Sequence, residues 1–109
     1  MQMNGIPFTT TDRSAVECTE HRGETGTAYW RTRTFGGVRV RLVEYSPDYL
    51  ADHWCSKGHI LFLLEGKPHT EFEDGRKYVL KPGMSYRLAD NAEAHSSYTA
   101  VGAKLFVVD

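Results

Sequence analysis

The chain has 109 residues, of which 40% are apolar and 25% are charged. This is the composition of a globular chain, which excludes a disordered or fibrous protein. The length suffices for a single domain over residues 1–109 and is too short for two. A formal net charge of −1 provides no broad basic surface, so we expect neither nucleic acid nor a membrane as a partner.

The N-terminal region predicts a cytoplasmic protein with a short leading arm. Residues 1–12, which include Thr9-Thr10-Thr11, are interpreted as a loosely held arm. Residues 1–8 lack the basic and apolar regions of a signal peptide. The two cysteines, Cys18 and Cys55, are too few for a disulfide framework. The longest apolar run is five residues, far too short to span a bilayer.

Short apolar or alternating segments follow one another along the chain, separated by turn residues, and this pattern is typical of an all-β sandwich or barrel. The predicted strands are Val16–Glu20, Ala28–Phe35, Val38–Tyr45, Ile60–Leu64, His69–Glu73, Tyr78–Leu80, Ser85–Leu88, Ser96–Ala100 and Leu105–Val108. The pairs Gly36-Gly37 and Asp74-Gly75 suit two-residue hairpin turns, because glycine adopts the positive φ that such turns require.

Two of these segments indicate which faces they present. Residues 38–43 alternate between apolar side chains and a face that begins with Arg39 and Arg41. Residues 60–64 are apolar without alternation, so we expect both faces to be covered, either within the barrel wall or under a partner subunit.

Four arginines lie on adjacent predicted strands, namely Arg31, Arg33, Arg39 and Arg41. They could line a pocket that receives a carboxylate or a phosphate. Such a set is more commonly the solvated face of an outer sheet, and this is the interpretation that we favour.

Potential metal ligands are concentrated in one short stretch, with one more further on. His53, Cys55 and His59 fall within seven positions, and His95 follows later. Residues two apart on a strand share a face, about 6.6 Å apart, so His53 and Cys55 would point the same way. His59 can return to the same cavity after the turn at Gly58. Imidazole and thiolate bind zinc, iron, nickel and copper.

This spacing resembles the motifs of the cupin superfamily, the RmlC-like jelly rolls. The first cupin motif has two histidines one residue apart, then a glutamate, then a glycine seven positions later. His53, Cys55, His59 and Gly66 occupy those four positions here. His95 matches the histidine of the second motif. Residues 52–55 also resemble the bacterial cupin-fold proteins named for an Asp-His-Cys-Trp (DHCW) motif, a group without an assigned reaction.

The resemblance implies a single-domain double-stranded β-helix that forms a homodimer. It also implies a divalent metal in the barrel held by His53, Cys55, His59 and His95. Zinc is the first expectation, with iron, nickel and copper as alternatives. The sequence departs from the motif at two ligand positions, because Cys55 replaces a histidine and His59 replaces a glutamate. The site is therefore softer than that of ordinary cupins.

Two other roles for these residues stay open. Cys55 could be a small buried residue beside hydrogen-bonded histidines, with no metal at all. Cys55 could also be a nucleophile or redox thiol activated by His53 or His59, although no oxyanion hole is evident.

The function that follows is a small-molecule binding or accessory protein, and the alternative is a metal-dependent oxygenase, isomerase or lyase acting on a small polar metabolite. Four protein ligands would close the coordination of zinc, whereas a six-coordinate ion would keep two open positions. Parity along the strands places Tyr86, Ser97 and Thr99 in the cavity wall beside His95. Trp54, between two ligands, should point away from them.

Overall fold

The computed structural model describes residues 3–109, and its regular structure is almost entirely β. Its elements are η1 (Arg13–Ala15), β1 (Cys18–Arg22), β2 (Thr27–Phe35), β3 (Val38–Tyr45), β4 (Tyr49–Leu50), β5 (His59–Gly66), β6 (His69–Phe72), β7 (Lys77–Val79), β8 (Ser85–Leu88), β9 (His95–Thr99) and β10 (Ala103–Val108). All nine predicted strands are present, with ends shifted by no more than two residues, and only β4 was not predicted. Within residues 3–109 no helix has the length and apolarity needed to cross a membrane.

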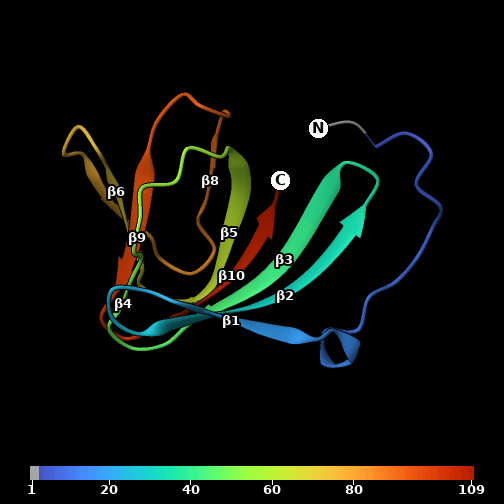
Figure 1. Cartoon of the computed structure of the whole chain (residues 1–109), viewed down its shortest axis with the longest axis horizontal. Helices are drawn as coiled ribbons and strands as arrows, with labels where there is room; N and C mark the ends of the chain where they lie inside the picture. Colours follow the sequence, from blue (N-terminus) through green and yellow to red (C-terminus); the bar gives the residue numbers. More distant parts are fainter. Residues whose placement is uncertain (1–2) are drawn as a thin grey trace.

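The strands form two antiparallel sheets that face each other. The larger sheet has the order β1-β2-β3-β10-β5-β8, and the smaller has the order β4-β9-β6-β7. Figure 1 shows β6 and β9 on one side of the molecule and β2, β3, β5 and β10 on the other. From β4 onward the chain passes repeatedly between the sheets, which is the connectivity of a jelly roll. The predicted all-β jelly-roll barrel is therefore confirmed.

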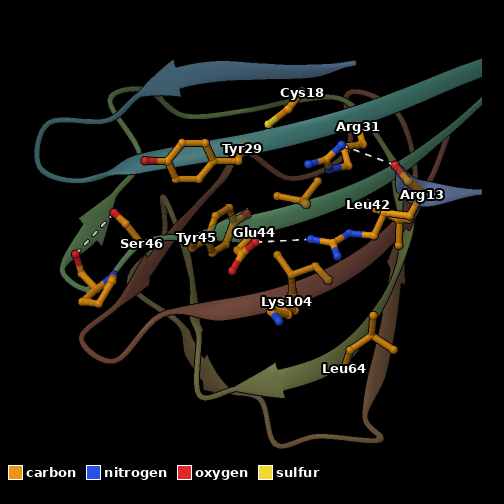
Figure 2. Close-up of a pocket in the computed structure, with 13 residues that line it drawn as sticks. Arg13, Cys18, Tyr29, Arg31, Leu42, Glu44, Tyr45, Ser46, Leu64 and Lys104 are labelled. Carbon is orange, nitrogen blue, oxygen red and sulfur yellow. Dashed lines mark hydrogen bonds and ion pairs between the residues drawn. The ribbon is translucent and has the colours of Figure 1, made fainter. Parts of the chain in front are cut away.

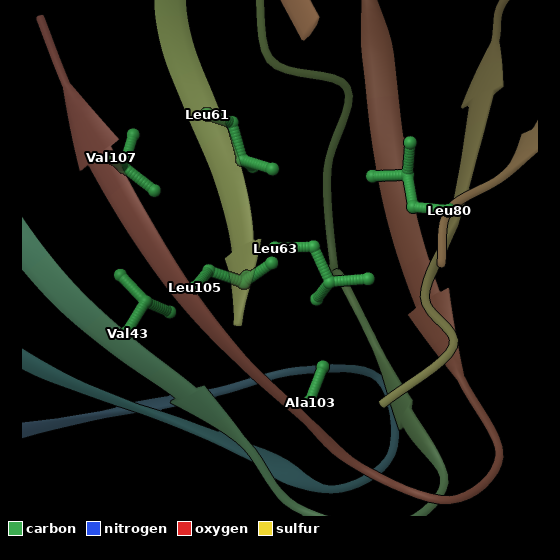
Figure 3. Packing of buried hydrophobic residues seen from close by; sticks show 7 residues of the cluster. All are labelled: Val43, Leu61, Leu63, Leu80, Ala103, Leu105 and Val107. Atoms are coloured by element: carbon green, nitrogen blue, oxygen red, sulfur yellow. The ribbon is translucent and has the colours of Figure 1, made fainter. Parts of the chain in front are cut away.

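The apolar core lies between the sheets and is built mainly by the larger one. Leu61 and Leu63 on β5 alternate with outward residues, and Leu105 and Val107 on β10 do the same. Leu63 is 0% exposed and Leu105 is 1% exposed. Figure 3 shows seven residues of this cluster, to which Val43, Leu80 and Ala103 also belong. Burial of these side chains supplies the main favourable free energy of folding.

The opposite face of the same strands is apolar but exposed. Ile60, Phe62 and Leu64 on β5 are 46%, 40% and 45% exposed, and Phe106 on β10 is 38% exposed. Within this chain residues 60–64 are thus covered on one face only, so the expectation that the barrel wall covers both faces is wrong. The alternative, that a partner subunit covers the second face, stays a prediction.

Gly66 ends β5 at a point where two backbones approach closely. Its φ is +97°, and a Cβ there would collide with the carbonyl oxygen of Gly102 and with Ala103 at the start of β10. Only glycine meets both requirements at low cost. The glycine that the cupin resemblance singled out therefore has a packing reason for its identity.

The segment before the barrel contains no helix or strand from residue 3 to residue 12, and most of its side chains are exposed. Met1 and Gln2, at the start of the predicted arm, lie outside the described residues. The loose attachment of the arm and the single-domain assignment stay predictions.

Candidate functional site

The four predicted ligands line one cavity between the two sheets. Its volume is about 150 Å³, and His53, Cys55, His59 and His95 all contribute to its wall. They come from three places in the fold: the loop after β4, the start of β5 and the start of β9. The fold thus places His53 and His95, which are more than forty positions apart in sequence, in the wall of the same cavity.

Backbone pairing holds Cys55 directly against His95. The N–H of Cys55 donates to the carbonyl of His95 at 2.7 Å, and the N–H of His95 donates to the carbonyl of Cys55 at 3.0 Å. This is an isolated antiparallel bridge between the loop and β9. The neighbouring glycine, Gly58, allows the loop to lie against residues 88–90, since a Cβ at that position would collide with their backbone.

His59 and His95 approach each other inside the cavity. Their ring centroids are 5.1 Å apart in an edge-to-face arrangement. His95 is 3% exposed, and its Nδ1 lies 3.2 Å from the carbonyl oxygen of Glu93. Because a carbonyl oxygen only accepts, Nδ1 carries a proton and donates to it.

The electrostatics of the cavity keep His59 neutral. Burial lowers the pKa of His59 to about 4, and the charges of His95 and Arg41 add to this effect. Its Nε2 lies 3.0 Å from the hydroxyl of Tyr86. Burial raises the pKa of Tyr86 well above its ordinary value, so this hydroxyl remains protonated and donates to the imidazole.

His53 is the outlying member of the set. Its side chain is 71% exposed, and its Nδ1 bonds to Oδ1 of Asp52 at 2.6 Å. A carboxylate partner on one ring nitrogen orients the imidazole and leaves the other nitrogen available, as in many metal-binding histidines. The neighbouring Trp54 is 44% exposed, which agrees with the prediction that it points away from the ligands.

The four predicted ligands are of the right chemical types for a divalent transition metal, but their side chains are not arranged around one point. Three imidazoles and a thiolate are suitable ligands. However, within residues 3–109 no group of three or more His, Cys, Asp or Glu side chains is arranged to hold a metal ion. Binding by all four residues would therefore require side-chain rearrangement within the cavity.

The predicted wall residues behave differently from one another. Tyr86 and Ser97 line the cavity. Thr99 is not among its lining residues and is 0% exposed. The Thr99 hydroxyl instead donates to the carbonyl of Gly102 and accepts from its N–H, both at 3.1 Å. It therefore closes the turn between β9 and β10, and the prediction that it lies in the cavity wall was wrong.

The arginines divide between the two faces of the larger sheet. Arg39 and Arg41 line the cavity, and Arg41 is only 8% exposed. The expectation of a solvated arginine face is therefore wrong for these two. Arg33 is exposed as expected, and Arg31 lines a second hollow on the outer face. The cause is parity, since Arg39 and Arg41 share the inward face of β3 with Val43.

That second hollow is larger, at about 540 Å³, but it contains none of the predicted ligands. Figure 2 shows Leu42, Glu44, Leu64 and Lys104 on its floor, with an ion pair between Arg13 and Glu44 of 3.5 Å. Several long side chains of its wall are solvent-exposed, among them Arg13, Glu44 and Lys104. We therefore place the candidate site in the smaller cavity, where buried polar groups converge.

Several residues of the smaller cavity were not identified from the sequence, among them one aromatic and two charged side chains. Trp30, Lys57 and Asp109 all line it. Asp109 follows the inward residues Leu105 and Val107 at the same parity, so a signal for its direction was present in the sequence. Both cysteines are free thiols; Cys18 is exposed and Cys55 is half-buried.

Comparisons with known proteins identify the fold. No model of a known protein family and no curated protein matches the sequence. An RmlC-like cupin from Shewanella frigidimarina has a TM-score of 0.72 and 15% identity, covering 94% of this chain and 90% of that one. Ectoine synthase from P. lautus has a TM-score of 0.72 and 19% identity, covering 93% and 76%.

A third similar structure, HppE with Fe(II), has a TM-score of 0.75 and 17% identity. The match covers 97% of this chain but 61% of the other, so the chain spans about three fifths of the length of HppE. Identities this low carry information about the fold alone. The chain has the fold of the cupin superfamily, an RmlC-like jelly-roll barrel.

Proposed function

We propose that this chain is a metal-binding cupin-fold protein that binds a small molecule in its barrel cavity. His53, Cys55, His59 and His95 would hold one divalent transition metal, with zinc first and iron, nickel or copper as alternatives. The observation that carries the proposal is that all four residues line the same 150 Å³ cavity. Cys55 and His95 are moreover paired through their backbones.

The partners of the histidines support this role. His53 is bonded to a carboxylate and His95 to a backbone carbonyl, in each case through Nδ1. Such outer partners fix the tautomer and orientation of metal-binding imidazoles. The buried hydroxyl of Tyr86 beside His59 is well placed to orient either that imidazole or a bound molecule.

A divalent ion in this cavity would act as a Lewis acid or as a structural centre, depending on whether a coordination position stays open. The protein would contribute a hollow between the two sheets and the neutral form of His59. The thiolate of Cys55 would balance one of the two positive charges of the ion.

Elemental analysis of protein purified without an affinity tag tests the proposal. We expect about one transition-metal ion per chain, and Cys55→Ser should lose most of it because a hydroxyl is a poor ligand for soft divalent ions. Cys18→Ser is the matched control, since Cys18 is exposed and outside the cavity. Metal loading that Cys55→Ser leaves unchanged would contradict the four-ligand site.

Cobalt substitution gives a second readout of the same ligand. A cobalt–thiolate bond produces an intense near-ultraviolet band, which should be present in the Cys18→Ser protein and absent from Cys55→Ser. A band of equal intensity in both variants would mean that the thiol does not bind the ion.

The alternative function, a metal-dependent enzyme, has one observation in its favour. Among the similar folds are ectoine synthase and HppE, the latter with Fe(II) and with a substrate. Loading the protein with Fe(II) and adding nitric oxide distinguishes the two functions. An iron–nitrosyl signal in electron paramagnetic resonance requires an exchangeable position and supports the enzyme, whereas tightly held zinc without such a position supports the binding role.

We further propose that the chain forms a homodimer through the outer face of the larger sheet. The register places Phe106 opposite both Phe62 and Leu42, and Val108 opposite both Ile60 and Val40. Together with Leu64 these residues form the outer apolar patch: Val40, Leu42, Ile60, Phe62, Leu64, Phe106 and Val108. A contiguous apolar surface of this kind marks an interaction site, and a second copy supplies an identical surface.

A further inference from the structure

Arg41 is a buried guanidinium whose hydrogen-bonding capacity is mostly unused. Its side chain is 9% exposed, and its Nε is buried without a hydrogen-bond partner in the described part of the chain. Among the bonds formed by residues 3–109, its single one runs from Nη2 to Oδ2 of Asp109 at 3.2 Å. Buried donors of this kind are rare, because each loses its bonds to water without replacement.

The one carboxylate nearby is already committed to another arginine. Arg39 donates from Nε to Oδ1 of Asp109 at 2.8 Å and from Nη2 to Oδ2 at 2.7 Å. This is a two-pronged bond, which is the strongest arrangement between these groups. Asp109 therefore neutralises Arg39 first, and Arg41 receives only a longer, shared contact.

The cavity as a whole has an excess of positive charge. Its charged lining residues are Arg39, Arg41, Lys57 and Asp109, which gives three positive charges against one negative charge when the histidines are neutral. A divalent ion bound with the Cys55 thiolate would add one further positive charge. This balance of charges favours an anionic ligand.

Trp30 holds the guanidinium of Arg41 in place. The Arg41 Cζ lies 4.4 Å from the centroid of the Trp30 ring, and His21 stacks on the same ring at 3.8 Å. This cation–π contact leaves N–H groups of the guanidinium, among them the unpartnered Nε–H, for hydrogen bonds to a ligand. Little further ordering would be needed to bind a ligand.

We propose that Arg41 binds the carboxylate of a small organic acid in this cavity, beside the candidate metal centre. The inference rests on the proposed function in taking this cavity as the ligand site. A volume of about 150 Å³ holds a molecule of about six non-hydrogen atoms, the size of benzene. An acid of three or four carbons fits that space.

A carboxylate suits this position better than a phosphate. Asp109 already presents a planar carboxylate to these two arginines, so the guanidinium edges are spaced for that group. A phosphate is larger and doubly charged, and it would bring its oxygens close to Asp109. The ligand class is therefore a small organic acid that presents a carboxylate.

Isothermal titration with L-lactate tests the proposal, with lactamide as the uncharged analogue and inorganic phosphate as the alternative anion. We expect lactate to bind and lactamide to bind at least ten times more weakly. Arg41→Gln should weaken lactate binding by about 10- to 100-fold, the usual worth of hydrogen bonds to a charged group. Arg33→Gln is the matched control, because it removes the same charge from the neighbouring strand outside the cavity.

A second measurement covers the case in which Arg41→Gln does not fold. Arg41→Lys keeps the charge and loses the planar fork, and it should also weaken lactate binding. In the otherwise unchanged Trp54→Phe protein, lactate should alter the fluorescence of Trp30, which contacts Arg41. Absence of lactate binding by the parent protein, equal losses in Arg41→Gln and Arg33→Gln, or tighter binding of phosphate than of lactate would each overturn the proposal.

The two proposals fail separately in these experiments. Metal content is measured on the same preparations before titration. A protein that binds lactate through Arg41 but holds no metal contradicts the metal site and leaves the carboxylate subsite standing. A protein that holds metal through Cys55 but fails every lactate criterion contradicts the carboxylate subsite alone.

Discussion

The two faces of the larger sheet distribute charged and apolar side chains in the reverse of the usual pattern of a globular protein. Near one end of the sheet the inward face carries Arg39, Arg41 and Asp109 around a cavity. The outward face over the same strands carries Ile60, Phe62 and Phe106, all at least 38% exposed. Charge is buried where apolar groups would be expected, and apolar groups are exposed where charge would be expected.

This inversion is confined to one end of the inward face. Toward the other end, Leu63, Ala103 and Leu105 form a dense apolar core (Figure 3). The barrel thus has an apolar half that stabilises the fold and a polar half in which buried charged side chains lower the free energy of unfolding. This division indicates two candidate functional regions: the polar cavity inside the barrel and the outer apolar patch.

The largest expected effect comes from truncating the core half of the inward face. Leu63→Ala should lower the free energy of unfolding by about 3 kcal/mol, because it leaves a cavity at a side chain that is 0% exposed. Phe62→Ala, one residue away on the outward face, should cost about 1 kcal/mol or less in the isolated chain. Urea unfolding at low protein concentration measures both, and equal losses would contradict the assignment of faces.

The second largest effect concerns the buried charges. Asp109→Asn removes the shared acceptor of Arg39 and Arg41 and should cost about 2 kcal/mol in the free energy of unfolding. Burial alone would raise the pKa of Asp109, but the hydrogen bond from Arg39 and the charges of both arginines outweigh burial and hold it below 3.8.

The sign of the pH dependence follows from that depressed pKa. The unfolded chain binds a proton more readily at this residue, so the stabilisation is complete above the ordinary pKa of 3.8 and is lost as pH falls through the lower, folded-state value. Asp109→Asn should therefore flatten the acid limb of the stability curve below about pH 4. Glu73→Gln, at an exposed position, is the control and should leave that limb unchanged.

The outer face can be tested through the oligomeric state. Phe62→Glu places a charge at the centre of the outer apolar patch, where Phe62 faces Phe106, and should convert a dimer to a monomer. Light scattering coupled to gel filtration would show the mass halving, while circular dichroism stays unchanged. Arg33→Glu on the same sheet is the control, and a parent protein that is monomeric at all concentrations would refute the proposed dimer.

Much of the fold could be predicted from the sequence because it depends on local rules. Turn glycines and alternating apolar residues located nine of the strands within two residues. The two-residue strand Tyr49–Leu50 was missed, since it is too short to show a period and is fixed by its pairing with β9. The glycine spacing also identified Gly66, whose close contact with Gly102 depends on the absence of a side chain.

The four predicted ligands of the candidate site could be identified from the sequence, whereas some of the other residues that line the cavity could not. The spacing of His53, Cys55, His59 and His95 brought together residues that do line one cavity. The inward direction of Arg41 was missed, because surface is the usual location of arginine and only the tertiary packing decides which face of β3 turns inward. Thr99 was misplaced for a different reason: it lies inside the barrel but beyond the cavity, and its hydroxyl is bonded to the backbone of Gly102.

The smallest expected effect lies at the aromatic ring beneath Arg41. Trp30 contacts His21 at 3.8 Å and Arg41 at 4.4 Å. Burial lowers the pKa of His21, and the charge of Arg41 lowers it further. Since the folded-state pKa lies below 6.5, the stabilisation from neutral His21 is present above that pH and declines as the pH falls below it.

Because His21 is only partly buried, this contribution should amount to about a few tenths of a kcal/mol. His21→Gln should remove it, and His69→Gln, at a histidine outside the cavity, should not. NMR titration of the imidazole provides the sharper measurement. Arg41→Gln should move the pKa of His21 back toward 6.5, because one of its two perturbing causes is then absent. A pKa unmoved by Arg41→Gln would mean that the charge on the inward face is screened from the ring, and that the two faces of the sheet differ less in their electrostatics than in their packing.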